Sequence, residues 1–166
     1  MPTNPDARQR LVTATAEMLS RRGLNATSVR EVAKAADAPL GSTYHYFPGG
    51  KQQMVVEALQ YAGEQFGSAL STAFSEGPVK GLRSFFAMWR KNLLRSDFRI
   101  GCPVLAVSIE EPSDEAAQEA LKTADVVFAQ WESLLCKSFK EAGMANKDAA
   151  QIAVMTISAF EGVAAM

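Results

Sequence analysis

Residues 27–51, TSVREVAKAADAPLGSTYHYFPGGK, carry the start and stop signals of two short helices separated by a tight turn. Ser28 stands three residues before a glutamate, the spacing at which a hydroxyl and a carboxylate cap the start of a helix. Asp37 falls where this helix must end, since aspartate tolerates a left-handed backbone better than most residues. Pro39 suits the first position of the next helix, because proline lacks the N–H group that is unpaired there. These signals predict helices at about 28–36 and 39–46.

Two helices joined in this way are typical of a helix-turn-helix, in which the start of the second helix enters the major groove of DNA. Gly41 and Ser42 are small enough to let the backbone of that helix approach base edges. The hydroxyls of Thr27 and Ser28 cap a helix and can also contact a phosphate. This interpretation assigns the following residues to DNA: Thr27, Ser28, Pro39, Leu40, Gly41, Ser42, Tyr44, His45 and Lys51.

The run Tyr44-His45-Tyr46-Phe47 admits two interpretations. In the first, Tyr44 and His45 reach the DNA, while one of the next two rings holds the helix to the rest of the domain. In the second, all four rings pack in the core. The flanking helix-turn-helix pattern favours DNA contact by at least one of Tyr44 and His45, with Phe47 in the core.

Lys51 follows two glycines at the start of a third predicted helix. Backbone N–H groups, the helix dipole and the ammonium group can converge there on a phosphate. The alternative is a lysine that is simply solvated. Arg8 and Arg30 leave the same two possibilities open.

Residues from about 10 to 54 resemble the tetracycline-repressor (TetR) family of bacterial regulators. The matches stand at fixed offsets: Leu11, Val12, Ala14, Ala16, Leu19, Gly23, Thr27, Ser28, Val32, Ala33, Ala36, Gly41, Ser42, Tyr44, His45, Tyr46, Phe47 and Lys51. The FPGGK ending and the segment Gly101-Cys102-Pro103-Val104 are similar to the subgroup of lincomycin- and flavonoid-responsive repressors. The resemblance implies a homodimer that binds a double-stranded DNA operator and a small effector.

The sequence departs from the family pattern at three places. Asp37 replaces the glycine usual in the turn, Ala38-Pro39 replaces the common Val-Ser, and Thr43 stands where a larger apolar residue is usual. These changes concern the preferred DNA sequence more than the fold. At 166 residues the chain is also short for the family by roughly one helix. We therefore expect a last helix, and with it part of the dimer interface, to be missing.

Apolar residues recur at helical spacing along the rest of the chain. They predict a first helix that Gly23 stops, a long helix at about 51–75 and three further helices, with a short apolar segment between Gly101 and Pro112. Strand signals are nearly absent. We predict an all-α fold: a three-helix DNA-binding domain at 1–50, joined by the long helix to a helical ligand-binding and dimerisation domain at 51–166.

Aromatic and methionine side chains in the second predicted domain suggest an apolar cavity between helices, although ordinary core packing explains each of them individually. Because the resemblance implies an effector, we assign seven residues to its pocket: Phe85, Phe86, Trp89, Cys102, Phe128, Trp131 and Met155. We expect a small apolar or aromatic ligand. Our hypothesis is that it moves the helix at 51–75 and changes the separation of two DNA-binding heads.

Composition is that of an ordinary globular protein, with 48% hydrophobic and 21% charged residues. No run approaches the roughly 18 apolar residues of a membrane span, and the polar N-terminus does not read as a secretory signal, so we expect a cytoplasmic protein. Residues 1–51 carry seven basic and four acidic residues, a net charge of +3, whereas the remainder carries −4. The N-terminal excess can therefore attract phosphate locally while the acidic part stays clear of DNA.

Enzymatic interpretations find little support. His45 is the only histidine, so a histidine-rich metal site is excluded. No histidine other than His45 could act as the general base for a cysteine nucleophile. Gly49-Gly50-Lys51 lacks the other residues of a nucleotide-binding loop. We predict no catalytic residues, metal or cofactor. Two rivals to a DNA-binding repressor remain: a helical protein-interaction or small-molecule-binding module without DNA binding, and an enzyme that uses the cavity.

Overall fold

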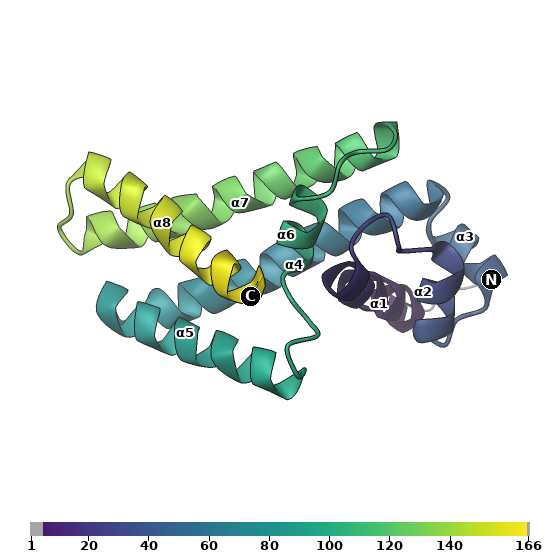
Figure 1. Ribbon diagram of the computed structural model, residues 1–166, viewed down its shortest axis with the longest axis horizontal. Coiled ribbons are helices and arrows are strands. Elements are labelled where there is room, and N and C mark those ends of the chain that lie inside the picture. Colours follow the sequence, from purple (N-terminus) through teal and green to yellow (C-terminus); the bar gives the residue numbers. More distant parts are fainter. Residues whose placement is uncertain (1–4, 166) are drawn as a thin grey trace. The chain divides into compact units, whose positions relative to one another are not determined.

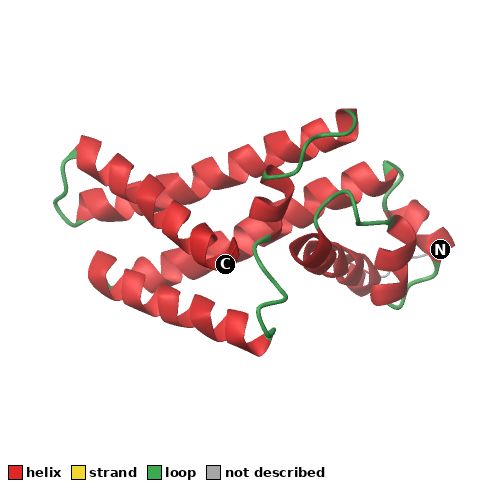
Figure 2. Cartoon of the chain, in the orientation of Figure 1, coloured by secondary structure: helices red, strands yellow, loops and turns green. Residues whose placement is uncertain are grey.

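The computed structural model describes residues 5–165, and these form eight helices and no strand (Figures 1 and 2). The helices are α1 Pro5–Arg22, α2 Val29–Ala35, α3 Leu40–Tyr46, α4 Gly50–Phe74, α5 Pro78–Arg95, α6 Pro103–Ser108, α7 Glu115–Glu141 and α8 Asn146–Ala165. The predicted all-α fold is confirmed. The short apolar segment proves to contain a helix, α6.

Local signals set the helix-turn-helix as expected. The Ser28 hydroxyl accepts a hydrogen bond from the backbone N–H of Glu31 at 3.3 Å and donates one to its carboxylate at 3.0 Å. Asp37 has a left-handed backbone, with φ of +49°. Pro39 differs by one position from the prediction: it is the N-cap of α3, with an extended ψ of 135°. Its carbonyl accepts the first bond of the helix, from Thr43 N at 3.2 Å.

Polar residues mark the starts of the two last helices. The carboxylate of Asp114 caps α7 by accepting a hydrogen bond from Ala117 N at 2.8 Å. Asn146 is the first residue of α8.

The chain divides into two compact units. The first contains the residues up to Ala62 together with Pro103–Asp125, and the second contains Gly63–Cys102 together with the residues from Val126 onward. Two of the three divisions fall inside a long helix, α4 and α7, and the third falls just before α6. The first unit therefore includes α1, α2 and α3, but also α6 and the first parts of α4 and α7.

In the first unit, an apolar core lies between α1, α2, the end of α3 and the start of α4. The buried members are Leu11, Val12, Val32, Ala36, Phe47 and Met54. Phe47 is 0% exposed, so its predicted place in the core is confirmed. Full burial of such a ring contributes about 1.5–3 kcal/mol. This contact fixes the end of α3 to the body of the unit.

The second unit is built around aromatic rings. The ring of Phe66, on α4, lies 4.0 Å from that of Trp131 and 4.9 Å from that of Phe85 between centroids. The indole N–H of Trp131 donates to the carbonyl of Gly63 at 2.9 Å. A Cβ at Gly63 would lie 2.8 Å from a methyl of Val127, so α4 and α7 approach each other closely here. The buried indole thus has both packing and a hydrogen-bond partner.

Candidate nucleic-acid interface and effector pocket

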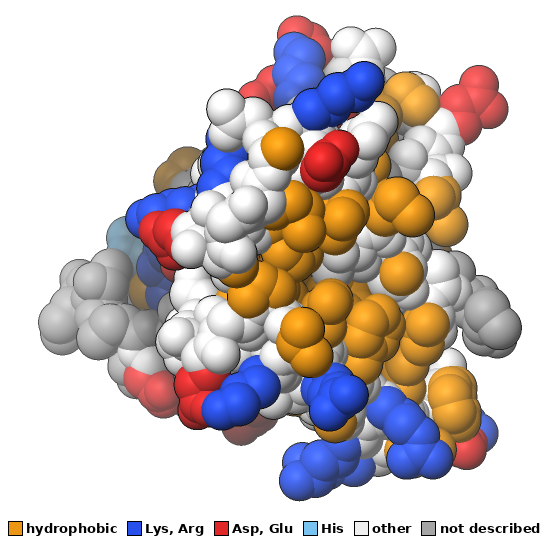
Figure 3. Space-filling view, turned by 90° about the vertical axis from the view of Figure 1, so that its left-hand side faces the viewer, with side chains coloured by type: hydrophobic (Ala, Val, Ile, Leu, Met, Phe, Trp, Pro, Cys, Tyr) orange, Lys and Arg blue, Asp and Glu red, His pale blue; other side chains and the backbone are white. Residues whose placement is uncertain are grey.

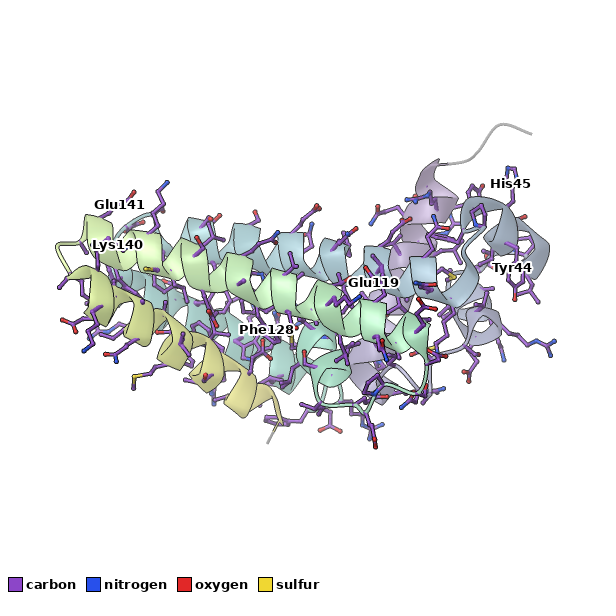
Figure 4. All side chains as sticks on the ribbon, turned by 90° about the horizontal axis from the view of Figure 1, so that it is seen from above. Tyr44, His45, Glu119, Phe128, Lys140 and Glu141 are labelled. Carbon is purple, nitrogen blue, oxygen red and sulfur yellow. The ribbon has the colours of Figure 1, made fainter. Side chains whose placement is uncertain are left out.

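One face of α3 is open to solvent. Pro39, Gly41 and His45 are exposed, and Tyr44 is 52% exposed, which is unusual for a large ring. Leu40 and Ser42 are partly buried. Figure 4 shows Tyr44 and His45 directed away from the ribbon at the end of the first unit. Interpreting all four rings of this run as core residues is therefore wrong for these two.

The opposite face of α3 holds the helix to the unit. Thr43 is fully buried, and its hydroxyl donates to the carbonyl of Pro39 at 3.3 Å. Tyr46 is half-buried and packs against the apolar core that contains Phe47. The small Thr43 thus occupies an inward position, and its departure from the family pattern concerns packing. Tyr44 and His45 are left to face outward.

Both candidate hydroxyls before α2 are engaged within the protein. Thr27 is buried, and its hydroxyl donates to the carbonyl of Gly23 at 2.6 Å. Ser28 is half-buried and forms the cap described above. Thr27 is consequently the least accessible of the nine residues assigned to DNA. Contact of either hydroxyl with a phosphate remains a prediction.

Lys51 is half-buried near the start of α4, and its ammonium group donates to the carbonyl of Leu24 at 2.8 Å. The side chain therefore ties α4 to the loop between α1 and α2, which differs from a freely solvated lysine. Arg8 is also engaged: it pairs with Glu57 at 2.5 Å, and its guanidinium lies 4.9 Å from the centroid of the Phe47 ring. Arg30 is exposed.

The same loop is held from a second side by Glu110, which lies between α6 and α7. Its carboxylate accepts hydrogen bonds from Leu24 N at 2.5 Å and from Asn25 N at 2.8 Å. Gly23 has a φ of +76°, and a Cβ there would lie 1.7 Å from a Glu110 oxygen. From the sequence, Glu110 near Pro112 is interpreted as part of a solvated helix junction, whereas the structure shows that it is hydrogen-bonded to this loop. No local pattern could have revealed it, because the partners stand 85 and 86 residues away along the chain.

All seven residues assigned to the effector pocket belong to the second unit, and six of them are buried or half-buried there. Phe85, Cys102 and Trp131 are buried, while Phe86, Trp89 and Phe128 are half-buried. Ring contacts connect most of them, through Phe66 and Trp131 and through Phe160 of α8: Phe66–Trp89 5.8 Å, Phe128–Trp131 5.4 Å, Phe85–Phe160 4.5 Å and Phe86–Phe160 4.3 Å. The structure thus brings these six residues into one part of the fold.

Met155 departs from the prediction. Its side chain is 69% exposed on the outer face of α8, so it does not line the interior of this unit. The reason is geometric: Ile157 and Phe160 point inward from the same helix, and Met155 stands on the other side of it.

Glu161 is a functional candidate that the sequence analysis missed. It is only 5% exposed, and burial raises the pKa of its carboxyl to about 7, while a weak hydrogen bond from the Cys102 thiol lowers it slightly. A signal was present in the sequence, because Glu161 is the only charged residue between positions 149 and 166. A single acid in an otherwise uncharged helix indicates a special environment.

The second unit also contains an open groove of about 180 Å³ along α4 and α7. It is lined by Leu70, Ser71, Phe74, Ser75, Leu134, Leu135, Lys137, Ser138 and Glu141. None of the residues assigned to the effector pocket borders it. Within residues 5–165, no three His, Cys, Asp or Glu side chains are grouped to hold a metal ion. No helix in that range combines the length and apolar character needed to span a bilayer.

Two sequence models of protein families match the chain. The model described as "Bacterial regulatory proteins, tetR family" matches residues 11–58. The model described as "Transcriptional regulator LmrA/YxaF-like, C-terminal domain" matches residues 78–166. Between them the two matches cover the helix-turn-helix, α8 and the aromatic rings of the second unit other than Phe66 and Phe74.

Individual proteins are similar over nearly the whole chain. An HTH-type transcriptional regulator of Mycobacterium tuberculosis is 37% identical over 158 residues, which cover 93% of this chain and 80% of that protein. The regulator YxaF of Bacillus subtilis is 27% identical, over 98% of this chain and 85% of its own. The crystal structure of a TetR regulatory protein from Rhodobacter sphaeroides superposes with a TM-score of 0.85 at 28% identity, over 95% of this chain and 86% of that one.

Proposed function

Because the chain belongs to the TetR family of bacterial transcriptional regulators, with an LmrA/YxaF-like C-terminal domain, we propose that it is a dimeric repressor that a small ligand releases from its operator. The observation that carries the DNA-binding part is the open face of α3, where Tyr44 and His45 project from a helix fixed by the buried Phe47. Proteins of this family are regulators rather than enzymes. We place its action in the cytoplasm, where bacterial DNA lies.

DNA recognition in this proposal uses two kinds of contact. The net positive charge of residues 1–51 supplies affinity for phosphates that does not depend on sequence and weakens with salt. The exposed face of α3 supplies the choice of sequence. At Gly41 a Cβ would meet no atom within 4 Å, so the backbone there is open to close approach by a base pair. Since the neighbouring side chains are small, we expect DNA shape to carry much of the specificity.

Dimerisation in this proposal uses the outer face of α8. Val154, Met155, Ser158, Ala159, Gly162 and Val163 are all exposed. They form an uncharged stripe at helical spacing, while the inner face of the same helix is mostly apolar, with Thr156 and Glu161 as its buried polar residues. A helix that is largely apolar all round is normally covered on every side. Seen from the side at which α8 begins, apolar side chains form a continuous patch with Lys and Arg along one edge (Figure 3).

A symmetric dimer would present two copies of α3 to a pseudo-palindromic operator, with half-sites about one helical turn (roughly 34–36 Å) or somewhat more apart. An effector lowers DNA affinity only if it binds better to the arrangement that does not fit DNA, and the coupling is reciprocal. Helix α4 is continuous from the first unit into the second. We propose that the ligand acts through α4 on the separation of the two heads.

The test of DNA binding is an unbiased selection of duplexes, followed by fluorescence anisotropy at several salt concentrations. We expect a palindromic consensus and affinity that falls as salt rises. A variant with both Tyr44→Ala and His45→Ala should lose the consensus, whereas Gln60→Ala, an exposed change on α4, should keep it. A protein that leaves every duplex unbound in dilute salt would support the rival, a helical module that acts through protein contacts alone.

A further inference from the structure

Two side chains of the second unit have buried polar atoms without a conventional hydrogen-bond partner. Among the residues that the structure describes, these are Trp89, through its indole Nε1, and Glu161, through both carboxylate oxygens. Burying a polar group without a partner is unfavourable, and a buried carboxylate is the more unfavourable of the two. The Cys102 thiol beside Glu161 is only a weak donor. Glu161 therefore has unused capacity to bind a donor or a cation.

Both residues stand on the helices α5 and α8, which contact each other through aromatic rings. Phe160, which precedes Glu161, packs against the rings of Phe85 and Phe86 with centroids 4.5 and 4.3 Å apart. Trp89 stands one helical turn beyond Phe85 on α5, and its ring meets that of Phe66 edge-on at 5.8 Å. The buried carboxylate thus belongs to a unit that is rich in aromatic rings, and it directly follows one of them along α8.

Among the residues that the structure describes, no lysine or arginine forms an ion pair with this carboxylate. Every lysine and arginine of the described second unit is exposed: Lys80, Arg83, Arg90, Lys91, Arg95, Arg99, Lys137, Lys140 and Lys147. A cation that entered from solution would be favoured by a charge-assisted hydrogen bond to the carboxylate, and the aromatic rings of the same unit would favour an aromatic or apolar skeleton beside the cation. An anion would be repelled, and a neutral apolar molecule would leave the carboxylate unpaired.

We propose that Glu161 is the polar anchor of the effector site and selects a ligand that carries a protonated amine on an aromatic or apolar skeleton. This inference rests on the proposed function in placing the effector inside the second unit, and it narrows the class of ligand. The indole N–H of Trp89 is available to an acceptor on the same molecule. Burial raises the pKa of Glu161 to about 7, so that the protonated and charged forms coexist at pH 7 without ligand. An ammonium group against the carboxyl lowers this pKa again and favours the charged form.

The test compares two probes of the same skeleton, naphthalen-2-ylmethylamine and naphthalen-2-ylmethanol, by isothermal titration of the full chain at pH 7. A hydrogen bond to a charged group predicts that the wild-type protein binds the amine about 10- to 100-fold more tightly than the alcohol. Glu161→Gln keeps the shape of the side chain but cannot become charged, and it should bind both probes equally. Glu161→Met, of similar length, is the second variant if the amide does not fold by circular dichroism.

Glu141→Gln is the matched control. Glu141 lies at the end of α7, is 68% exposed and borders the open groove along α4. This variant should keep the preference for the amine. A preference that survives in both Glu161 variants, or that disappears in Glu141→Gln, would overturn the proposal. Equal binding of the two probes by the wild-type protein, or binding of neither, would also overturn it.

Failure of this inference is distinguishable from failure of the proposed function. If the protein binds its selected duplex but shows no preference for the amine, the Glu161 site is refuted and DNA binding stands. If the amine binds through Glu161 yet leaves the affinity for the duplex unchanged, the site is supported and ligand-controlled repression is refuted. Anisotropy with saturating amine provides this second measurement.

Discussion

The carboxylate of Glu110 offers the sharpest test of how the loop between α1 and α2 is held. It accepts hydrogen bonds from two backbone N–H groups, Leu24 N at 2.5 Å and Asn25 N at 2.8 Å. We predict that Glu110→Gln destabilises the protein even though the two side chains have nearly the same shape. An amide has one oxygen, so one of the two bonds is lost and its NH₂ group is turned toward a backbone donor.

The size of the effect follows from these contacts. A hydrogen bond to a charged group contributes about 1.5–3 kcal/mol, and the partly buried bond to Leu24 lies nearer the upper end than the exposed bond to Asn25. Glu110→Gln, which loses one bond, should therefore lower the free energy of unfolding by about 1.5–3 kcal/mol. Glu110→Ala, which removes both bonds, should lower it by about 3–6 kcal/mol. For a chain of this length each kcal/mol corresponds to about 2–4 °C in Tm.

The assay is urea unfolding followed by circular dichroism at constant protein concentration. Glu111→Gln is the matched control, because it makes the same change one residue further on, at an exposed side chain. This control should stay within about 0.5 kcal/mol of the wild-type protein. If Glu110→Gln is as stable as Glu111→Gln, the two hydrogen bonds do not hold the loop and the reasoning is refuted.

Three further outcomes are expected. Tyr44→Phe and His45→Ala should each weaken operator binding in anisotropy while the free energy of unfolding falls by less than about 1 kcal/mol, since both side chains are exposed; an unfolded His45→Ala protein would contradict this. Lys51→Ala should weaken binding evenly across sequences and reduce the salt slope by about 1; a change of consensus would instead assign Lys51 to base recognition. Burial holds the pKa of Glu161 at about 7, above the 4.5 of the unfolded chain, so its protonated form stabilises the fold below pH 4.5 and this stability is lost as pH rises through 7. In urea titrations the free energy of unfolding of the wild-type protein should therefore fall by about 3 kcal/mol between pH 4 and 8 relative to that of Glu161→Gln. If the free energies of the two proteins change with pH in parallel, the assignment is refuted.

The helix-turn-helix was predictable because its signals are local. A cap such as Ser28 and its partner stand three residues apart, and the left-handed turn at Asp37 depends on that residue's own backbone. The inward place of Phe47 follows from the same short-range geometry, because α3 is brief and both its ends are marked. The match of residues 11–58 to the TetR family rests on this same segment. Even the error at Pro39 is a shift of one residue.

The roles of Lys51 and Glu110 depended on tertiary structure. Their partners in the loop before α2 lie 27 residues away for Lys51 and 85–86 residues away for Glu110 along the chain. A lysine at the start of a helix and a glutamate before a proline have the same local sequence whether they are solvated or bonded. Only the folded chain decides between these states.

Helix α8 shows most clearly which properties the sequence determines and which the tertiary structure decides. Its composition determined that it is a helix and that it is apolar, but residues of this kind occur on every side of it, so periodicity could not select the inner face. Packing against α5 turned Phe160 and Glu161 inward and left Met155 outside. The sequence thus determined which segments are helices, because helix formation is governed by residues that are close together along the chain. The fold decided which side chains are buried together, because that choice belongs to contacts between distant segments.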